Sequence, residues 1–239
     1  MVRARIASMM KINLRACALA ALSITSFSAY AGLYNDATGD VAVPGGEPPN
    51  AHMDISSVLV SNTLTDITFQ INLVGDPVSP NWAKYNIIMR SPIGGDLDMS
   101  ADGNAWGRNY ALAGGANRFV AGWTDQVANN SQGHAFAAGS WSQTSTFTSV
   151  IGANSVTYSV SLASLGLVAG NTLVFDVVTT GGGDDGAVDA LSNPNPQITD
   201  WSQHSTVAGL EYLVTPVPEP ASLMALGVGT VAVLRRRKR

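Results

Sequence analysis

The sequence predicts an all-β fold: an antiparallel, jelly-roll-like β-sandwich with a signal helix before it and a short membrane helix after it. Short segments rich in Val, Ile, Thr and aromatic residues recur every 10 to 20 residues along the chain. Clusters of Gly, Asn, Asp and Pro separate them, and no amphipathic helix connects them. Many short strands with turn signals and no crossover helices are typical of antiparallel sandwiches and jelly rolls.

The first 31 residues have the composition of a signal peptide. Four basic residues come first, namely Arg3, Arg5, Lys11 and Arg15. The apolar run that follows has about 12 residues, which suits a signal peptide and is short of the ~20 that a spanning helix needs. Ala29 and Ala31 form the small-x-small pattern that signal peptidase cuts, so the mature chain is predicted to begin at Gly32. A start at Met10 instead of Met1 would leave an equally complete signal peptide.

Residues 32–214 are the predicted sandwich domain. The only cysteine, Cys17, lies in the leader, so the domain must be held by its core, or by its core and a metal. The domain contains four basic residues against sixteen acidic ones, a net charge of −12. Such a surface repels phosphate backbones, which argues against nucleic acid as a partner, and it suits divalent cations or neutral glycans.

Nine segments of this domain carry the strand pattern of alternating apolar and β-branched residues. They are residues 55–62, 65–74, 84–91, 118–126, 134–143, 145–151, 155–161, 172–180 and 206–214. One helical turn is predicted at 161–167, where Gly166 ends it. No internal repeat is visible, and the Pro-rich stretch "TPVPEP" marks the end of the domain.

The order of acidic landmarks along the domain forms a loose pattern. "YNDATGDV" comes early, Asp54 stands at the head of the strand in "MDISSVLVSN", and "VFDVVTTGGGDDGAVDALSNP" comes late. This order resembles the β-sandwiches related to family 9 carbohydrate-binding modules and the DOMON group. The resemblance implies acidic residues at the first strands, a Gly/Asp loop after a late strand, and sugars, haem or calcium as ligands. The histidines and methionines do not match the haem-ligand pattern of that group; these are His52, His134, His204, Met53, Met89 and Met99.

Calcium is the cofactor that the acidic loops favour, and two loops are candidates. The first has the spacing D-x-S-x-D-G-N, with Asp98, Ser100, Asp102 and Asn104 as oxygen donors. Alternate residues in a tight turn can direct oxygens to one hard cation. A complete loop of this kind needs an acid at its twelfth position, where this sequence has Asn109, so the match is partial.

The second candidate loop, "GGGDDGAVDALSN", carries three acids: Asp184, Asp185 and Asp189. Following the resemblance, this loop could close around a cation over Asp36, Asp40 or Asp54. Three acids in one loop repel one another unless they are solvated or neutralised. The alternative is a solvated, mobile loop without a ligand.

Five tryptophans offer a platform for sugars. Indole faces stack on the apolar faces of sugar rings, while neighbouring polar side chains take the hydroxyls. Three of them, Trp82, Trp106 and Trp201, stand among Gly, Asn and Asp residues and are the predicted ligand-binding residues. Trp123 and Trp141 lie inside strand patterns and are expected in the core.

No enzyme signature stands out, so no residue is assigned a catalytic role. The sequence has no nucleophile elbow, no zinc-protease helix motif and no phosphate-binding loop. The predicted role is non-catalytic binding of glycan or calcium, or a structural one. A secreted carbohydrate-active enzyme and a haem-binding domain of the DOMON kind remain the alternatives, since any two of the sixteen acids could meet in a cleft.

Residues 215–239 form a tail with three distinct parts. Val217, Pro218, Glu219 and Pro220 come first, then the apolar run 221–234, then five basic residues: Arg235, Arg236, Arg237, Lys238 and Arg239. As a helix, the run would be about 21 Å long against a hydrocarbon core of about 30 Å. The basic residues resist translocation and hold the end of the chain in the cytoplasm. The physical picture is a marginal, transient membrane anchor.

These three parts, in this order, resemble the PEP-CTERM sorting signal of Gram-negative bacteria. The resemblance implies that exosortase, a membrane protease-transpeptidase, cleaves near the motif at residues 217–220 and releases or transfers the protein. It also implies an association with exopolysaccharide. The expected route runs through the Sec translocon and signal peptidase, then a transient inner-membrane anchor, then the cell envelope or the extracellular space.

Overall fold

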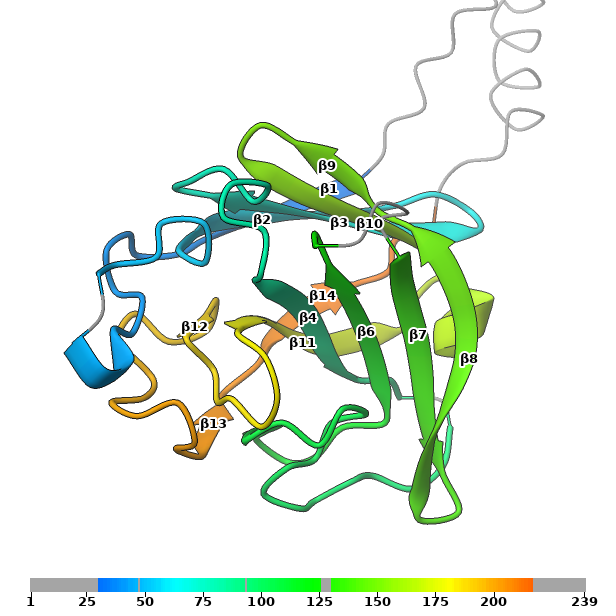
Figure 1. Ribbon diagram of the computed structural model, residues 1–239. Helices are drawn as coiled ribbons and strands as arrows, with labels where there is room; N and C mark the ends of the chain where they lie inside the picture. The colour runs from blue at the N-terminus through cyan, green and yellow to red at the C-terminus, as the bar shows by residue number, and fades with distance from the viewer. Residues whose placement is uncertain (1–29, 47, 93, 126–129, 217–239) are drawn as a thin grey trace, which may run out of the picture. The chain divides into compact units, whose positions relative to one another are not determined.

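Two antiparallel sheets pack face to face in the computed structural model (Figure 1), which describes residues 30–46, 48–92, 94–125 and 130–216. The first sheet has five strands in the order β1-β2-β3-β10-β9. Their bounds are β1 Tyr30–Asn35, β2 Ile55–Asn62, β3 Asp66–Leu73, β10 Ser155–Ser161 and β9 Val150–Gly152. The sheet lies above the second one in the view of Figure 1.

The second sheet has seven strands, in the order β12-β11-β4-β6-β7-β8, with β14 also paired to β11. The bounds are β12 Asp189–Ala190, β11 Thr172–Thr180, β4 Lys84–Arg90, β6 Arg118–Trp123, β7 Asn130–Ala137, β8 Ser140–Thr148 and β14 Leu210–Leu213. Two further strands, β5 Tyr110–Leu112 and β13 Ser205–Val207, pair in parallel with each other. The two short 3-10 helices are η1 Pro44–Gly46 and η2 Ala163–Leu165.

The five-stranded sheet is buried on one face only. β3 alternates strictly between partly exposed and buried residues, and β2 and β10 follow nearly the same alternation. On the buried face, Val58, Ile71 and Val156 lie opposite one another across three strands. A period of two in the sequence predicts this arrangement, because successive side chains of a strand point to opposite faces.

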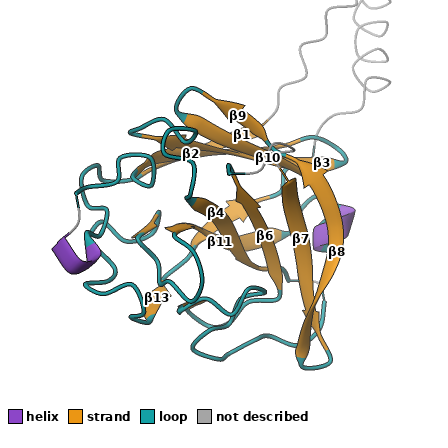
Figure 2. Cartoon of the chain, viewed as in Figure 1, coloured by secondary structure: helices purple, strands orange, loops and turns teal. Residues whose placement is uncertain are grey.

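The seven-stranded sheet is covered on both faces. Its central strands β4, β6 and β11 are buried along almost their whole length. One face packs against the first sheet in the main core, where Tyr85 and Phe175 are fully buried. The other face carries a second apolar cluster, in which Ile88 and Phe119 lie against residues of the segments around β5 and β13. Long loops therefore form a third layer, drawn in teal in Figure 2.

The predicted all-β antiparallel sandwich is confirmed, and most strand segments lie where the pattern placed them. Three segments were wrong as single strands. Residues 134–143 are the hairpin of β7 and β8, which turns at Ala138 and Gly139, both at positive φ. Residues 145–151 contain the end of β8 and the start of β9, and residues 206–214 contain the end of β13 and all of β14. The 3-10 turn ended by left-handed Gly166 is present as predicted. The predicted signal helix and membrane helix lie outside the described residues. In the part of the chain that is described, no helix is long and apolar enough to cross a membrane.

Candidate functional site

Three aspartates meet beside β12 and form what we call the acidic cage: Asp40, Asp54 and Asp189. Asp40 lies in the segment after β1, Asp54 immediately precedes β2, and Asp189 opens β12. One carboxylate oxygen of each lies within 4.8 Å of those of the other two. Two bonds hold the segments together: Ala42 N donates to Val188 O at 2.8 Å, and Ile55 N donates to Asp189 Oδ2 at 2.7 Å.

The acidic cage is buried and lacks a compensating charge. Asp40, Asp54 and Asp189 are 8%, 4% and 1% exposed. Both carboxylate oxygens of Asp40 and Oδ1 of Asp54 are buried without a hydrogen-bond partner. The two ion pairs found among the described residues, Lys84–Asp125 and His204–Asp102, do not involve the cage. Buried carboxylates without partners are costly, so this arrangement requires a counter-ion or bound protons.

The electrostatics of the acidic cage agree with this requirement. Burial raises the pKa of Asp189 to about 8, and the nearby carboxylates of Asp36 and Asp40 add to the rise. Burial also raises the pKa of Asp40 and the pKa of Asp54. A cation placed between these groups would reverse the effect, because opposite charge favours the ionised form.

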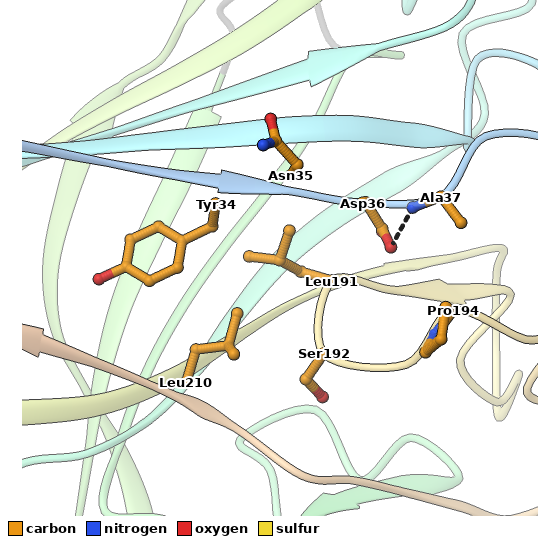
Figure 3. Close-up of a pocket in the computed structure, with 8 residues that line it drawn as sticks. All are labelled: Tyr34, Asn35, Asp36, Ala37, Leu191, Ser192, Pro194 and Leu210. Atoms are coloured by element: carbon orange, nitrogen blue, oxygen red, sulfur yellow. Dashed lines mark hydrogen bonds between the residues drawn. The ribbon is translucent and has the colours of Figure 1, made fainter.

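Asp36 stands at the side of the acidic cage. Burial, followed by the charge of Asp40, raises its pKa to about 8. Its Oδ1 accepts a hydrogen bond from Ala37 N at 2.9 Å, whereas Oδ2 is buried without a partner. Asp36 also lines a pocket of about 330 Å³ together with Tyr34, Leu191 and other residues (Figure 3). This pocket brings solvent-accessible space next to the cage.

The predicted calcium loop at residues 98–104 uses its oxygens within the chain. Asp98 accepts hydrogen bonds from Ser100 Oγ at 2.6 Å and from Trp141 Nε1 at 2.7 Å. Asn104 Oδ1 accepts hydrogen bonds from Trp106 N at 3.2 Å and from Arg108 N at 3.1 Å. Asp102 Oδ1 is paired with His204.

The structure brings only Asp189 of the predicted calcium ligands into the acidic cage. Asp184 is exposed and Asp185 partly exposed, and their charges act on Arg108. Over the described ranges, the cage is the one group of histidine, cysteine or acidic residues close enough together to hold a metal ion.

Two of the three predicted sugar-binding tryptophans lie together. The rings of Trp82 and Trp201 are 5.9 Å apart at 70°, and His52 meets Trp82 edge-on at 5.0 Å. Both tryptophans are partly exposed. Gly181 makes their approach possible, since a Cβ at this position would come within 3.2 Å of Trp82 and 3.3 Å of Trp201 and would overlap Asp185.

Arg108 connects this pair with two further tryptophans. Its guanidinium lies 5.1 Å from the ring centroid of Trp106, and its Nη1 donates to Gly181 O at 2.9 Å. Trp106 in turn lies 5.6 Å from Trp123, which is also partly exposed. We call the resulting surface the tryptophan patch: Trp82, Trp106, Trp123, Trp201 and Arg108. Trp141 lies outside it, with its ring against Phe136 and Phe119.

Sequence reasoning placed Trp123 in the core and assigned no role to Arg108. Trp123 belongs to the tryptophan patch because β6 pairs with β4. Trp123 lies opposite Lys84, the first residue of β4, and Trp82 comes two residues before Lys84. The sequence contains one further signal for the acidic cage, which could have selected two of its members. Asp40 and Asp189 each adjoin short apolar residues, in "DVAV" and "AVDAL", which indicates burial of the acid.

The fold and these two sites define a β-sandwich module with a buried acidic cage and a tryptophan patch. Residues 216–239 match the family described as the PEP-CTERM protein-sorting motif. No curated protein matches the chain. The end of the chain is therefore a PEP-CTERM sorting signal, which implies export and processing by exosortase. The resemblance of the sandwich to carbohydrate-binding modules and DOMON domains stays a prediction.

Proposed function

We propose that the sandwich is a non-catalytic glycan-binding module, which exosortase delivers to the cell envelope or an exopolysaccharide matrix. The tryptophan patch is the observation that carries this proposal. Four of the five tryptophans come from separate segments of the chain and lie partly exposed around Arg108. Exposed indoles are costly to leave in water, and together they give stacking faces for sugar rings.

Polar groups near the tryptophan patch could bind hydroxyls. The carboxylate of Asp185 lies close to Gly181, as do the rings of Trp82 and Trp201, and Asp184 is exposed in the same loop. The Arg108 guanidinium supplies the single buried positive charge of the patch. With a net charge of −12 on the domain, the expected ligand is a neutral polysaccharide and not an acidic one.

The delivery route follows from the two ends of the chain. Residues 1–31 would direct the chain to the Sec translocon and signal peptidase, and residues 221–234 would hold it in the inner membrane until exosortase acts. A cut after Ala31 would leave residues 32–35 of β1 paired with β2. The sandwich would then reach the envelope with its edge strand shortened by two residues.

Binding of the exported protein to insoluble neutral polysaccharides, cellulose and xylan among them, tests the proposal. We expect saturable binding without release of reducing sugar. Trp201→Ala should raise the Kd about tenfold or more, a loss of about 1.4 kcal/mol or more in binding free energy.

Trp141→Ala is the matched control, because Trp141 is also partly exposed and packed on aromatic rings but lies outside the tryptophan patch. It should leave the Kd unchanged. Equal effects of both substitutions would remove the patch from the binding site. Release of reducing sugar in proportion to protein would instead establish the alternative, a carbohydrate-active enzyme.

A further inference from the structure

We propose that the acidic cage, with Asp36 beside it, is a calcium site that closes the sandwich at its β12 end. The inference does not depend on glycan binding, since the acidic cage and the tryptophan patch use different side chains. It rests on two observations: the carboxylate oxygens of Asp40, Asp54 and Asp189 converge within 4.8 Å, and several of them are buried without a partner.

The donor set selects the kind of ion. Every group of the acidic cage offers oxygen, and neither cysteine nor histidine belongs to it. Oxygen-only sites suit calcium, magnesium and manganese, whereas zinc and copper prefer nitrogen or sulfur ligands. Calcium takes six to eight oxygen ligands in a flexible geometry and accepts carboxylates, backbone carbonyls and waters together, so three carboxylates with Asp36 beside them suit it. Magnesium keeps several waters and is usually held by one or two carboxylates.

The carboxylates are partly oriented by backbone groups that leave other oxygens free for an ion. Gly39 N donates to Asp54 Oδ2 at 2.8 Å. Asp189 accepts at both oxygens, from Ala190 N at 2.8 Å and from Ile55 N at 2.7 Å. Asp54 Oδ1 and both oxygens of Asp40 are left without partners. Asp36 Oδ2 is free in the same way and stands nearest to the pocket of Figure 3, through which an ion could enter.

A bound calcium ion would join three stretches of chain that are far apart in the sequence. Asp36 and Asp40 belong to the segment after β1, Asp54 to the start of β2, and Asp189 to β12 on the other sheet. The ion would thus tie the first strands of one sheet to the edge of the second. In a domain without cysteine, this is the stabilising role that a disulfide has in other exported proteins.

Calorimetric titration and thermal unfolding of the exported protein test the site, using calcium chloride after treatment with a chelator. We expect one calcium ion per chain. At a hundredfold excess over Kd, calcium should raise the Tm by roughly 5–10 °C, and the chelator should reverse the rise. Magnesium at the same concentration should give a much smaller shift.

The isosteric variant Asp40→Asn gives the sharpest result. It should bind calcium at least a hundredfold more weakly, yet without calcium it should be more stable than the unsubstituted protein, because it removes one of the repelling carboxylates. Asp98→Asn, from the other predicted loop, should bind calcium normally. A Tm of the unsubstituted protein that does not respond to calcium, an unchanged affinity in Asp40→Asn, or an equal response to magnesium would overturn the assignment.

Discussion

Asp176 is a fully buried acid in the middle of β11, outside the acidic cage. Its oxygens accept hydrogen bonds from Ser192 N at 3.2 Å and Gly209 N at 3.1 Å. Burial nevertheless raises its pKa to about 6, above the value of about 3.9 in an unfolded chain. The folded protein therefore holds this proton more tightly than the unfolded chain does. The resulting stabilisation is present below about pH 3.9 and is lost as the pH rises through about 6.

We predict that Asp176→Asn flattens the dependence of stability on pH. Between pH 4 and pH 7, the unfolding free energy of the unsubstituted protein should fall by about 2 kcal/mol more than that of the variant. Urea unfolding at a series of pH values, with calcium held at one concentration, measures the difference. Parallel curves for the two proteins would show that Asp176 does not titrate in this range.

Gly181 is the residue on which the geometry of the tryptophan patch most depends. Gly181→Ala should weaken glycan binding several-fold, because the added Cβ would push apart Trp82, Trp201 and Asp185. Gly182→Ala is the control at the next position, where a Cβ would meet nothing within 4 Å. Affinity measured for both on the same polysaccharide checks the prediction, and equal affinities would contradict it.

At the scale of strands, three predicted segments match the structure at both ends. β2, β10 and β11 have the bounds that their patterns predicted, and a period of two is clear in β10. β5 and β12 were not predicted, because strands of three and two residues under a layer of loops are too short to show a period. The β7–β8 turn was missed because Ala138, at positive φ, is not a residue that marks a turn.

From the resemblance, the sequence predicted that the loop with Asp189 could close over Asp36, Asp40 or Asp54, but it did not select which of these acids meet. Asp189 is separated from Asp54 by 134 residues and from Asp40 by still more, and only the pairing of β11 with β12 and of β1 with β2 brings them together. Spacing within one loop, as at residues 98–104, is visible in a sequence. Convergence of three segments cannot be seen in spacing. Two of the three convergent acids, Asp40 and Asp54, carry buried oxygens without partners.

Asn62 fastens the last strand of the sandwich to β2, immediately before the sorting motif. Its Oδ1 accepts hydrogen bonds from Tyr212 Oη at 2.7 Å and Thr215 N at 3.1 Å, and its Nδ2 donates to Thr215 O at 3.0 Å. Asn62→Ala should lower the unfolding free energy by about 1–3 kcal/mol, because these buried bonds are lost together.

Ser61→Ala, on the opposite face of the same strand, should change the unfolding free energy by no more than about 0.5 kcal/mol. Urea unfolding of both variants gives the comparison. If Asn62→Ala and Ser61→Ala were equally mild, the connection between β2 and the end of the domain would carry little of the stability.

In the whole molecule, basic residues concentrate in the two terminal segments and acidic residues in the domain between them. Nine of the thirteen basic residues lie in the two terminal segments, and sixteen of the seventeen acidic ones lie in the domain between them. The C-terminal segment carries the sorting motif, the N-terminal segment is the predicted signal peptide, and the acidic domain carries the candidate binding sites. Because these roles are separate, the folded domain should be complete after both ends have been removed.

Intact-mass spectrometry of the protein from cells and from the medium tests this division most directly. We predict a mature species that begins at Gly32 and ends at or before the Val217–Pro220 motif, without the basic residues 235–239. A mature species that still carries those five residues at its end would show that the C-terminal segment is a permanent anchor and not a signal removed during sorting.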